Sequence, residues 1–118
     1  MEDVTIIIND APYGLERPWN ALRLALALTP AAMKSKVNVF LLGDAVSIAK
    51  KGQNPPQDYY NLEKMLTDLV GKGANVRACG TCLKSRGLSG EDLVAGVEIG
   101  TMMELAEWTK ESRVVLSF

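Results

Sequence analysis

The sequence predicts a single α/β domain over residues 1–118, a three-layer α/β/α sandwich around a five-stranded, mainly parallel sheet. Three observations carry this prediction. Short, strongly apolar runs alternate with segments of helical periodicity, and no Pro-, Gly- or Ser-rich stretch is long enough to link two domains. A chain of 118 residues can also bury about two-thirds of its unfolded surface in one core. Strands that alternate with helices over this length favour a flavodoxin-like fold.

The first half of the chain contains two strand–helix units. Residues 4–8 (VTIII) are apolar and β-branched, which is typical of a strand buried on both faces. A proline in the first turn and apolar residues three to four positions apart predict a helix over residues 17–29. Residues 37–42 (VNVFLL) repeat the buried-strand pattern. A short helix over residues 45–51 follows, and Asp44 is its expected N-cap.

A polar, proline-containing loop over residues 52–58 separates these units from the next. Apolar residues at helical spacing then predict a helix from about residue 59 to residue 71, where a Gly-Lys-Gly turn ends it. Residues 75–79 (NVRAC) predict a third strand, which is shorter and less apolar than the first two.

The last part of the chain repeats the alternation. Ser89 and the acidic residues after it suit the start of a short helix, and residues 96–100 predict a short fourth strand. Thr101 with Glu104 three positions later has the spacing of a capping box, so a helix is expected from there to about Lys110. Residues 114–116 complete the sheet as a fifth strand.

Composition excludes several classes of function. The chain has no histidine, which removes a Ser-His-Asp triad, a Cys-His dyad and a histidine metal site within one chain. Its 13 basic and 14 acidic residues are dispersed, and the P-loop and GxGxxG spacings are missing, so neither nucleic acid nor a nucleotide is the expected ligand. No leader or 18-residue apolar span is recognisable, and we expect a cytoplasmic protein without membrane association.

The only two cysteines, Cys79 and Cys82, lie three positions apart at the end of the third predicted strand. If a helical turn begins there, backbone N–H groups favour the thiolate form, and Cys79 is expected to have a lowered pKa. The residues alone leave four interpretations open. The cysteines can be small buried apolar residues, half of a zinc site shared with a second chain, a thioredoxin-type dithiol, or nucleophiles that carry and resolve a persulfide.

Three motifs follow one another along the chain: NDAPYG at residues 9–14, FLLGDAV at residues 40–46, and Cys79-Gly80-Thr81-Cys82 with Arg86-Gly87. In this order and spacing the chain resembles the DsrE/DsrF/TusD superfamily, particularly its small stand-alone DsrE-like members, over essentially its whole length. The resemblance implies a sulfur carrier, or a sulfurtransferase-like protein. Its sulfur-accepting cysteine lies eight positions before the glycine of the Arg-Gly pair, which is Cys79 here.

The resemblance also implies a homo-oligomer, a trimer or hexamer, with donor and acceptor proteins as partners and with no metal or organic cofactor. Cys82 departs from the pattern of the relay proteins, which do not generally need a cysteine there. It is the expected resolving thiol, so Cys82→Ser is expected to keep a persulfide on Cys79 and Cys79→Ser to abolish loading. The alternative function is a non-catalytic redox-sensing or ligand-binding subunit of an oligomeric assembly.

Ligands of parallel α/β folds bind beyond the carboxyl ends of the strands, where helix N-termini and loops converge. Residues of this edge can also simply make turns, cap helices or lie on the surface. Six of them are candidates for binding the substrate beside the cysteines: Asn9, Tyr13, Gly43, Asp44, Thr81 and Arg86.

Overall fold

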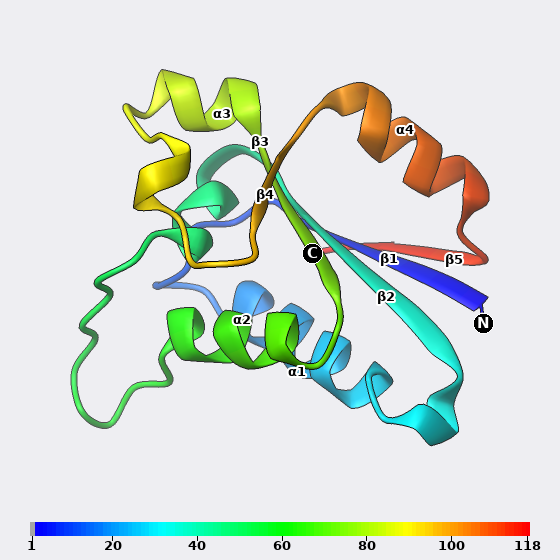
Figure 1. Ribbon diagram of the computed structural model, residues 1–118. Coiled ribbons are helices and arrows are strands. Elements are labelled where there is room, and N and C mark those ends of the chain that lie inside the picture. Colours follow the sequence, from blue (N-terminus) through cyan, green and yellow to red (C-terminus); the bar gives the residue numbers. More distant parts are fainter. Residues whose placement is uncertain (1) are drawn as a thin grey trace.

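The computed structural model describes residues 2–118 and contains one sheet of five parallel strands with helices on both faces (Figure 1). The strand order is β4-β3-β2-β1-β5, and each neighbouring pair is parallel. The predicted α/β fold is therefore confirmed. The strands are β1 (Glu2–Ile8), β2 (Ser35–Leu41), β3 (Asn75–Cys79), β4 (Glu98–Gly100) and β5 (Val114–Ser117).

The helices divide between the two faces and one end of the sheet. Two of them, α1 and α2, pack on each other over one face, and α4 lies on the other face (Figure 1). The short helices α3 and η2 follow directly after β3 and β2, at the carboxyl ends of the strands. The helices are α1 (Arg17–Leu28), α2 (Leu62–Gly71), α3 (Gly80–Ser85) and α4 (Met102–Glu111), with 3-10 helices η1 (Ala31–Met33), η2 (Gly43–Ala49) and η3 (Gly90–Asp92).

The core forms around β1 and β2, which pair from Glu2–Ser35 to Ile8–Leu41. Their β-branched and aliphatic side chains alternate between the two covered faces, and Ile6, Ile8 and Phe40 are fully buried. On the α4 face, the Phe40 ring meets the Trp108 ring edge to face, with 5.9 Å between the centroids. This contact packs α4 against the middle of the sheet.

Two predicted helix starts are wrong, for local reasons. The segment after β2 is the 3-10 helix η2, whose N-cap is Leu42; Asp44 lies in its first turn and pairs with Arg86 instead. The helix expected from residue 59 begins at Leu62, because the Asn61 side chain accepts the Lys64 N–H at 3.0 Å and caps it there.

The capping box predicted for α4 is confirmed. The Glu104 N–H donates to Thr101 Oγ1 at 3.1 Å, and the Thr101 N–H donates back to Glu104 Oε1 at 2.8 Å. Because a single residue, Thr101, separates the end of β4 from the start of α4, this cap fixes the sharp turn from the sheet into the helix.

Three methionines lie on the surface of the single chain. Met33, Met102 and Met103 are 50%, 60% and 70% exposed, and Met65 packs partly buried against the core. Among the helices of residues 2–118, none combines the length and the apolar character that a bilayer crossing requires.

Candidate functional site

Cys79 ends β3 and forms the N-cap of α3, so the chain turns from strand to helix at this residue. Its Sγ accepts the N–H of Cys82 at 3.4 Å, which satisfies one of the free donors of the first helical turn. Cys79 is only 6% exposed. The spacing of three residues therefore places Cys82 one helical turn from Cys79, with its N–H directed at the Cys79 sulfur. Both cysteines are free thiols.

Cys82 is half-buried and contacts a different element through its sulfur. The backbone N–H of Gly43, the first residue of η2, donates to Cys82 Sγ at 3.2 Å. Gly43 has a φ of +56°, a left-handed conformation that glycine adopts without strain. A glycine at this position therefore lets the backbone turn after β2 while presenting its N–H to the sulfur.

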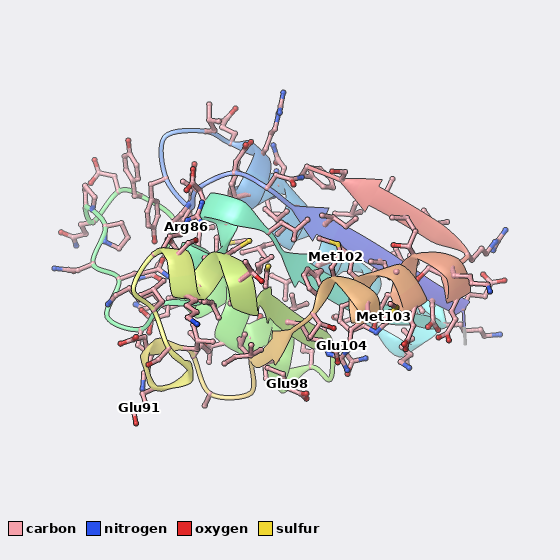
Figure 2. The ribbon with its side chains drawn as sticks, turned by 90° about the horizontal axis from the view of Figure 1, so that it is seen from above. Arg86, Glu91, Glu98, Met102, Met103 and Glu104 are labelled. Atoms are coloured by element: carbon pink, nitrogen blue, oxygen red, sulfur yellow. The ribbon has the colours of Figure 1, made fainter. Side chains whose placement is uncertain are left out.

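Both cysteines line a cavity of about 430 Å³ at the carboxyl edge of the sheet. Its wall consists of residues 79–82, residues 99–102 at the turn from β4 into α4, and Leu42 at the end of β2. Apart from the two sulfurs and Thr81 and Thr101, the side chains that face it are apolar. Met102 and Met103 begin α4 on the surface (Figure 2).

Arg86 and Asp44 form an ion pair that joins α3 to η2. The Arg86 guanidinium donates to Asp44 Oδ1 from Nη2 at 2.9 Å and from Nε at 3.1 Å. Its Nη1 donates to the carbonyl oxygen of Cys82 at 3.1 Å. Because the cation is paired with a carboxylate, it holds α3 beside Gly43 without adding a net charge to the site.

Burial raises the pKa of the Cys79 thiol, and its hydrogen bond with the Cys82 side chain raises it further. The backbone N–H groups of Cys82 and Thr81 act in the opposite direction but do not outweigh burial. This overturns the expectation of a lowered pKa for Cys79. The N–H groups expected at the start of the helix are present. However, the loss of hydration destabilises the thiolate more than these hydrogen bonds stabilise it.

The structure brings four of the six proposed binding residues together with the cysteines. Thr81 lines the cavity, Gly43 contacts Cys82, and Asp44 and Arg86 pair beside it.

Asn9 and Tyr13 have other partners and do not line this cavity. Asn9 Nδ2 donates to Ser117 Oγ at 3.0 Å and to the Phe118 carbonyl at 3.1 Å, which fastens β5 to β1. The Tyr13 hydroxyl donates to Gln53 Oε1 at 2.6 Å and accepts the Leu62 N–H at 3.3 Å. It therefore holds the loop before α2.

Sequence reasoning did not single out Leu42, Ile99 and Met102 as site residues. Each flanks a segment that was expected at the carboxyl edge of the sheet, and each is an apolar residue next to a turn. Apolar residues on both sides of the predicted strand–helix turn at Gly100-Thr101 are the sequence signal for two of them, and in the structure Ile99 is 53% and Met102 60% exposed.

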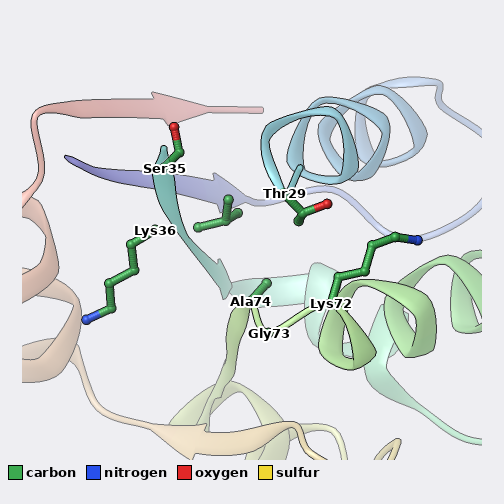
Figure 3. A pocket seen from close by; sticks show the side chains of 7 residues that line it. Thr29, Ser35, Lys36, Lys72, Gly73 and Ala74 are labelled. Atoms are coloured by element: carbon green, nitrogen blue, oxygen red, sulfur yellow. The ribbon is translucent and has the colours of Figure 1, made fainter. Parts of the chain in front are cut away.

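A smaller cavity of about 130 Å³ lies near the amino ends of β2 and β3 (Figure 3). Its lining includes Thr29, Lys36 and Lys72 but no thiol or carboxylate. Residues 2–118 also contain no group of three or more Cys, Asp or Glu side chains placed to hold a metal ion. Of these two cavities, the one at the carboxyl edge of the sheet has thiols in its wall.

Comparisons with known proteins agree with this fold. Residues 2–118 match the model of the DsrE/DsrF-like family. The chain is 42% identical to the protein YchN of Escherichia coli over all of both chains, and the crystal structure of that protein superposes with a TM-score of 0.93. An uncharacterized protein of Methanopyrus kandleri is 46% identical, covering 98% of this chain and 93% of its own. Protein TusC of Buchnera aphidicola is 26% identical over all of both chains.

Proposed function

Since this chain belongs to the DsrE/DsrF-like family, we propose that it is a sulfur carrier that holds sulfane sulfur as a persulfide on Cys79 and passes it to an acceptor. The family and the relationship to TusC suggest a role connected with sulfur relay. The observation that carries the proposal is the pair of free cysteines at the wall of one apolar cavity.

The chemistry needs only the two thiols and a persulfide donor. The Cys79 thiolate attacks the outer sulfur of the donor R–S–SH, the donor's S–S bond breaks, and R–S⁻ leaves with the electron pair. An acceptor thiolate removes the outer sulfur from Cys79 in the same way. Cys82 can instead attack Cys79 Sγ, which releases HS⁻ and leaves a Cys79–Cys82 disulfide. No metal or organic cofactor takes part in these steps.

The environment of Cys79 suits storage of a reactive sulfur. A persulfide there is largely shielded from solvent, because Cys79 is 6% exposed and its neighbours in the cavity are mainly apolar. Shielding slows hydrolysis and oxidation of such an intermediate. We propose that its partners are the proteins that donate and accept the sulfur, and that it acts in the cytoplasm. We also propose that the carrier is a homo-oligomer, either a trimer or a hexamer.

The test is mass spectrometry of intact protein after incubation with a small persulfide donor. We expect wild-type protein to gain the mass of one sulfur atom, which peptide mapping assigns to Cys79 and which a reducing thiol removes. Cys79→Ser is expected to carry no sulfur at residue 79 while remaining folded by circular dichroism. Wild-type protein that gains no sulfur on Cys79 would falsify the carrier function.

One observation favours a second candidate, a redox-sensing or ligand-binding subunit without turnover. The raised pKa of Cys79 keeps it protonated at neutral pH, as in a structural thiol. Under this function Cys79 reacts slowly with iodoacetamide at neutral pH, and sulfur added to the protein does not reach any acceptor thiol. Transfer of labelled sulfur from the protein to an acceptor excludes this candidate.

A further inference from the structure

We propose that Cys82 receives sulfur first, from the donor, and then passes it inward to Cys79. This proposal rests on the sulfur-carrier function and adds an order to it: the exposed thiol loads, and the buried thiol stores. It assigns Cys82 a step before storage, in addition to any later part in resolving the persulfide.

Access to the cavity differs between the two sulfurs. Cys79 is 6% exposed and lies beneath the first turn of α3, whereas Cys82 is half-buried. A donor persulfide on a peptide or a small thiol must approach from solvent, and an S–S exchange needs the attacking sulfur in line with the S–S bond. Cys82 is the sulfur that such a donor meets first.

Hydrogen bonding also differs between them. Cys82 Sγ accepts the N–H of Gly43 at 3.2 Å, from an element outside its own helix. This contact holds the Cys82 sulfur at the wall of the cavity, from a backbone group that does not belong to α3. The N–H that Cys79 accepts, from Cys82, is longer at 3.4 Å, and burial together with the Cys82 side chain holds the proton on Cys79.

The contact between Gly43 and Cys82 is braced from two sides. The Arg86–Asp44 pair ties α3 to η2, and Arg86 also donates to the Cys82 carbonyl. Within η2 the main chain is anchored by four buried residues: Ala45, Val46, Ile48 and Ala49. The donor N–H therefore stays in place when Cys82 gains or loses a sulfur atom.

The two transfers balance in atoms and charge. First, Cys82–S⁻ attacks the outer sulfur of R–S–SH, and R–S⁻ leaves to give Cys82–S–SH. Then Cys79 attacks that same outer sulfur, and the proton of its thiol passes to the departing Cys82 sulfur. The products are Cys79–S–SH and Cys82–SH. Neither transfer needs an oxidant or a reductant, because the sulfane sulfur moves from one thiol to another.

The experiment follows the site of the added sulfur in time, by rapid quenching with an alkylating agent and peptide mapping. In wild-type protein treated with a small persulfide donor, we expect sulfur on Cys82 to precede sulfur on Cys79. Cys79→Ser and Cys79→Ala should load Cys82 at the wild-type rate, in contrast to the loss of all loading that the family resemblance implies for Cys79→Ser. In Cys82→Ser, the rate at which Cys79 is loaded should fall by about tenfold or more, since the accessible thiol is gone. Lys84→Ala, which keeps both thiols, is the matched control.

Two results separate the failure of this order from the failure of the function. If wild-type protein loads but Cys82→Ser loads Cys79 just as fast, the order is overturned and the carrier function stands. If wild-type protein takes up no sulfur on Cys79, the carrier function itself fails. Alkylation of wild-type protein without any donor gives an independent readout. Cys82 should react with iodoacetamide before Cys79 at neutral pH, and the reverse ranking would contradict the proposed order.

Discussion

At the scale of single residues, Cys79 is governed by burial more than by its place at the start of a helix. Two backbone N–H groups favour its thiolate, yet removal from water dominates and raises the pKa of the thiol. A raised pKa means that the folded state holds the proton more tightly than the unfolded state. The contribution of the Cys79 thiol to the free energy of unfolding is therefore fully present below the pKa of the unfolded thiol. It is lost as the pH rises through the pKa of the thiol in the folded protein.

The first prediction concerns the alkylation of Cys79 as a function of pH. Because only the thiolate reacts, the rate in the folded protein should rise at higher pH than the rate for the same residue in urea. Site-resolved mass spectrometry after iodoacetamide pulses measures both curves. Cys82→Ser, which retains the burial of Cys79, should show the same direction. Coincident curves for the folded and unfolded chain would contradict the effect of burial.

The second prediction compares the stability of alanine variants at two glycines, Gly100 and Gly71, which differ in the space around them. A Cβ at Gly100 would lie 2.8 Å from Phe40 Cε2 and 3.1 Å from Arg77 Cβ, whereas a Cβ at Gly71 meets nothing within 4 Å. Gly100→Ala should lower the free energy of unfolding by about 1–3 kcal/mol through overpacking. Gly71→Ala, at the end of α2, should raise it by about 0.5–1 kcal/mol by restricting the unfolded chain.

Urea denaturation of the two variants beside the wild type measures both changes. Since both substitutions add the same methyl group, the opposite signs isolate the effect of local space. A Gly100→Ala protein as stable as the wild type would show that the sheet shifts to admit the methyl group.

At the scale of secondary structure, the position of α4 depends on one carboxylate with two tasks. Glu104 Oε1 accepts the Thr101 N–H, and Glu104 Oε2 pairs with Arg77 Nη1 at 2.7 Å. The Arg77 guanidinium also lies over the Trp108 ring, 4.7 Å from its centroid. These contacts join the first turn of α4 to β3, and so hold the Thr101–Met102 wall of the cavity.

The third prediction follows from this double role. Glu104→Ala should lower the free energy of unfolding by about 1–2 kcal/mol, since it removes both the cap and the partner of Arg77. Glu107→Ala, an exposed site on the same helix, is the control and should change it by less than about 0.5 kcal/mol. Denaturant titration monitored by tryptophan fluorescence compares the two variants. Equal effects would mean that Glu104 contributes no more than a surface residue.

The elements of the fold were predictable wherever the determining contacts are local. The bounds of β3 and the capping box of α4 could be assigned because neighbouring residues determine them. The helix start at Leu62 was misplaced because Tyr59 and Tyr60 share the apolar character of the helix but lie in the loop before the Asn61 cap. Asp44 was assigned to a cap because its partner, Arg86, is 42 residues away in the sequence.

The candidate site was predictable in its nucleophiles but only partly in its walls. Cys79 and Cys82 are adjacent because of spacing within one turn, which sequence alone reveals. Ile99 and Met102 reach them because β4 lies beside β3 in the sheet, and the order of parallel strands is set by packing over the whole domain. For the same reason, Asn9 and Tyr13 could be assigned to the correct edge of the sheet but not to their partners there.

At the scale of the whole molecule, the sheet ends in an unprotected strand. β5 pairs only with β1, so its other side has no neighbour in the described chain. Val114, Val115 and Leu116 are 37–39% exposed, although apolar edge strands in monomers are usually covered or charged. An edge of this kind is the surface we expect to be covered in an oligomer.

The fourth prediction is that the protein sediments as a multiple of its 12.8 kDa chain at micromolar concentration. Leu116→Lys should weaken the assembly by about tenfold or more, because it places a charge on the apolar edge. Thr67→Lys, at an exposed position on α2, adds the same charge elsewhere and should leave the assembly unchanged. A single 12.8 kDa species for the wild-type protein would count against an oligomer.

The exposed thioethers at the start of α4 make one rim of the cavity sensitive to oxidation. Met102 lines the cavity and is 60% exposed, and Met103 beside it is 70% exposed. Peroxide converts such side chains to sulfoxides, which are polar and which reductases restore. Because both thioethers are far more exposed than Cys79, we expect peroxide to oxidise this rim of the cavity first. Under the proposed function, the first lesion is then a reversible one at the rim, and the sulfur proposed to carry the cargo is reached later.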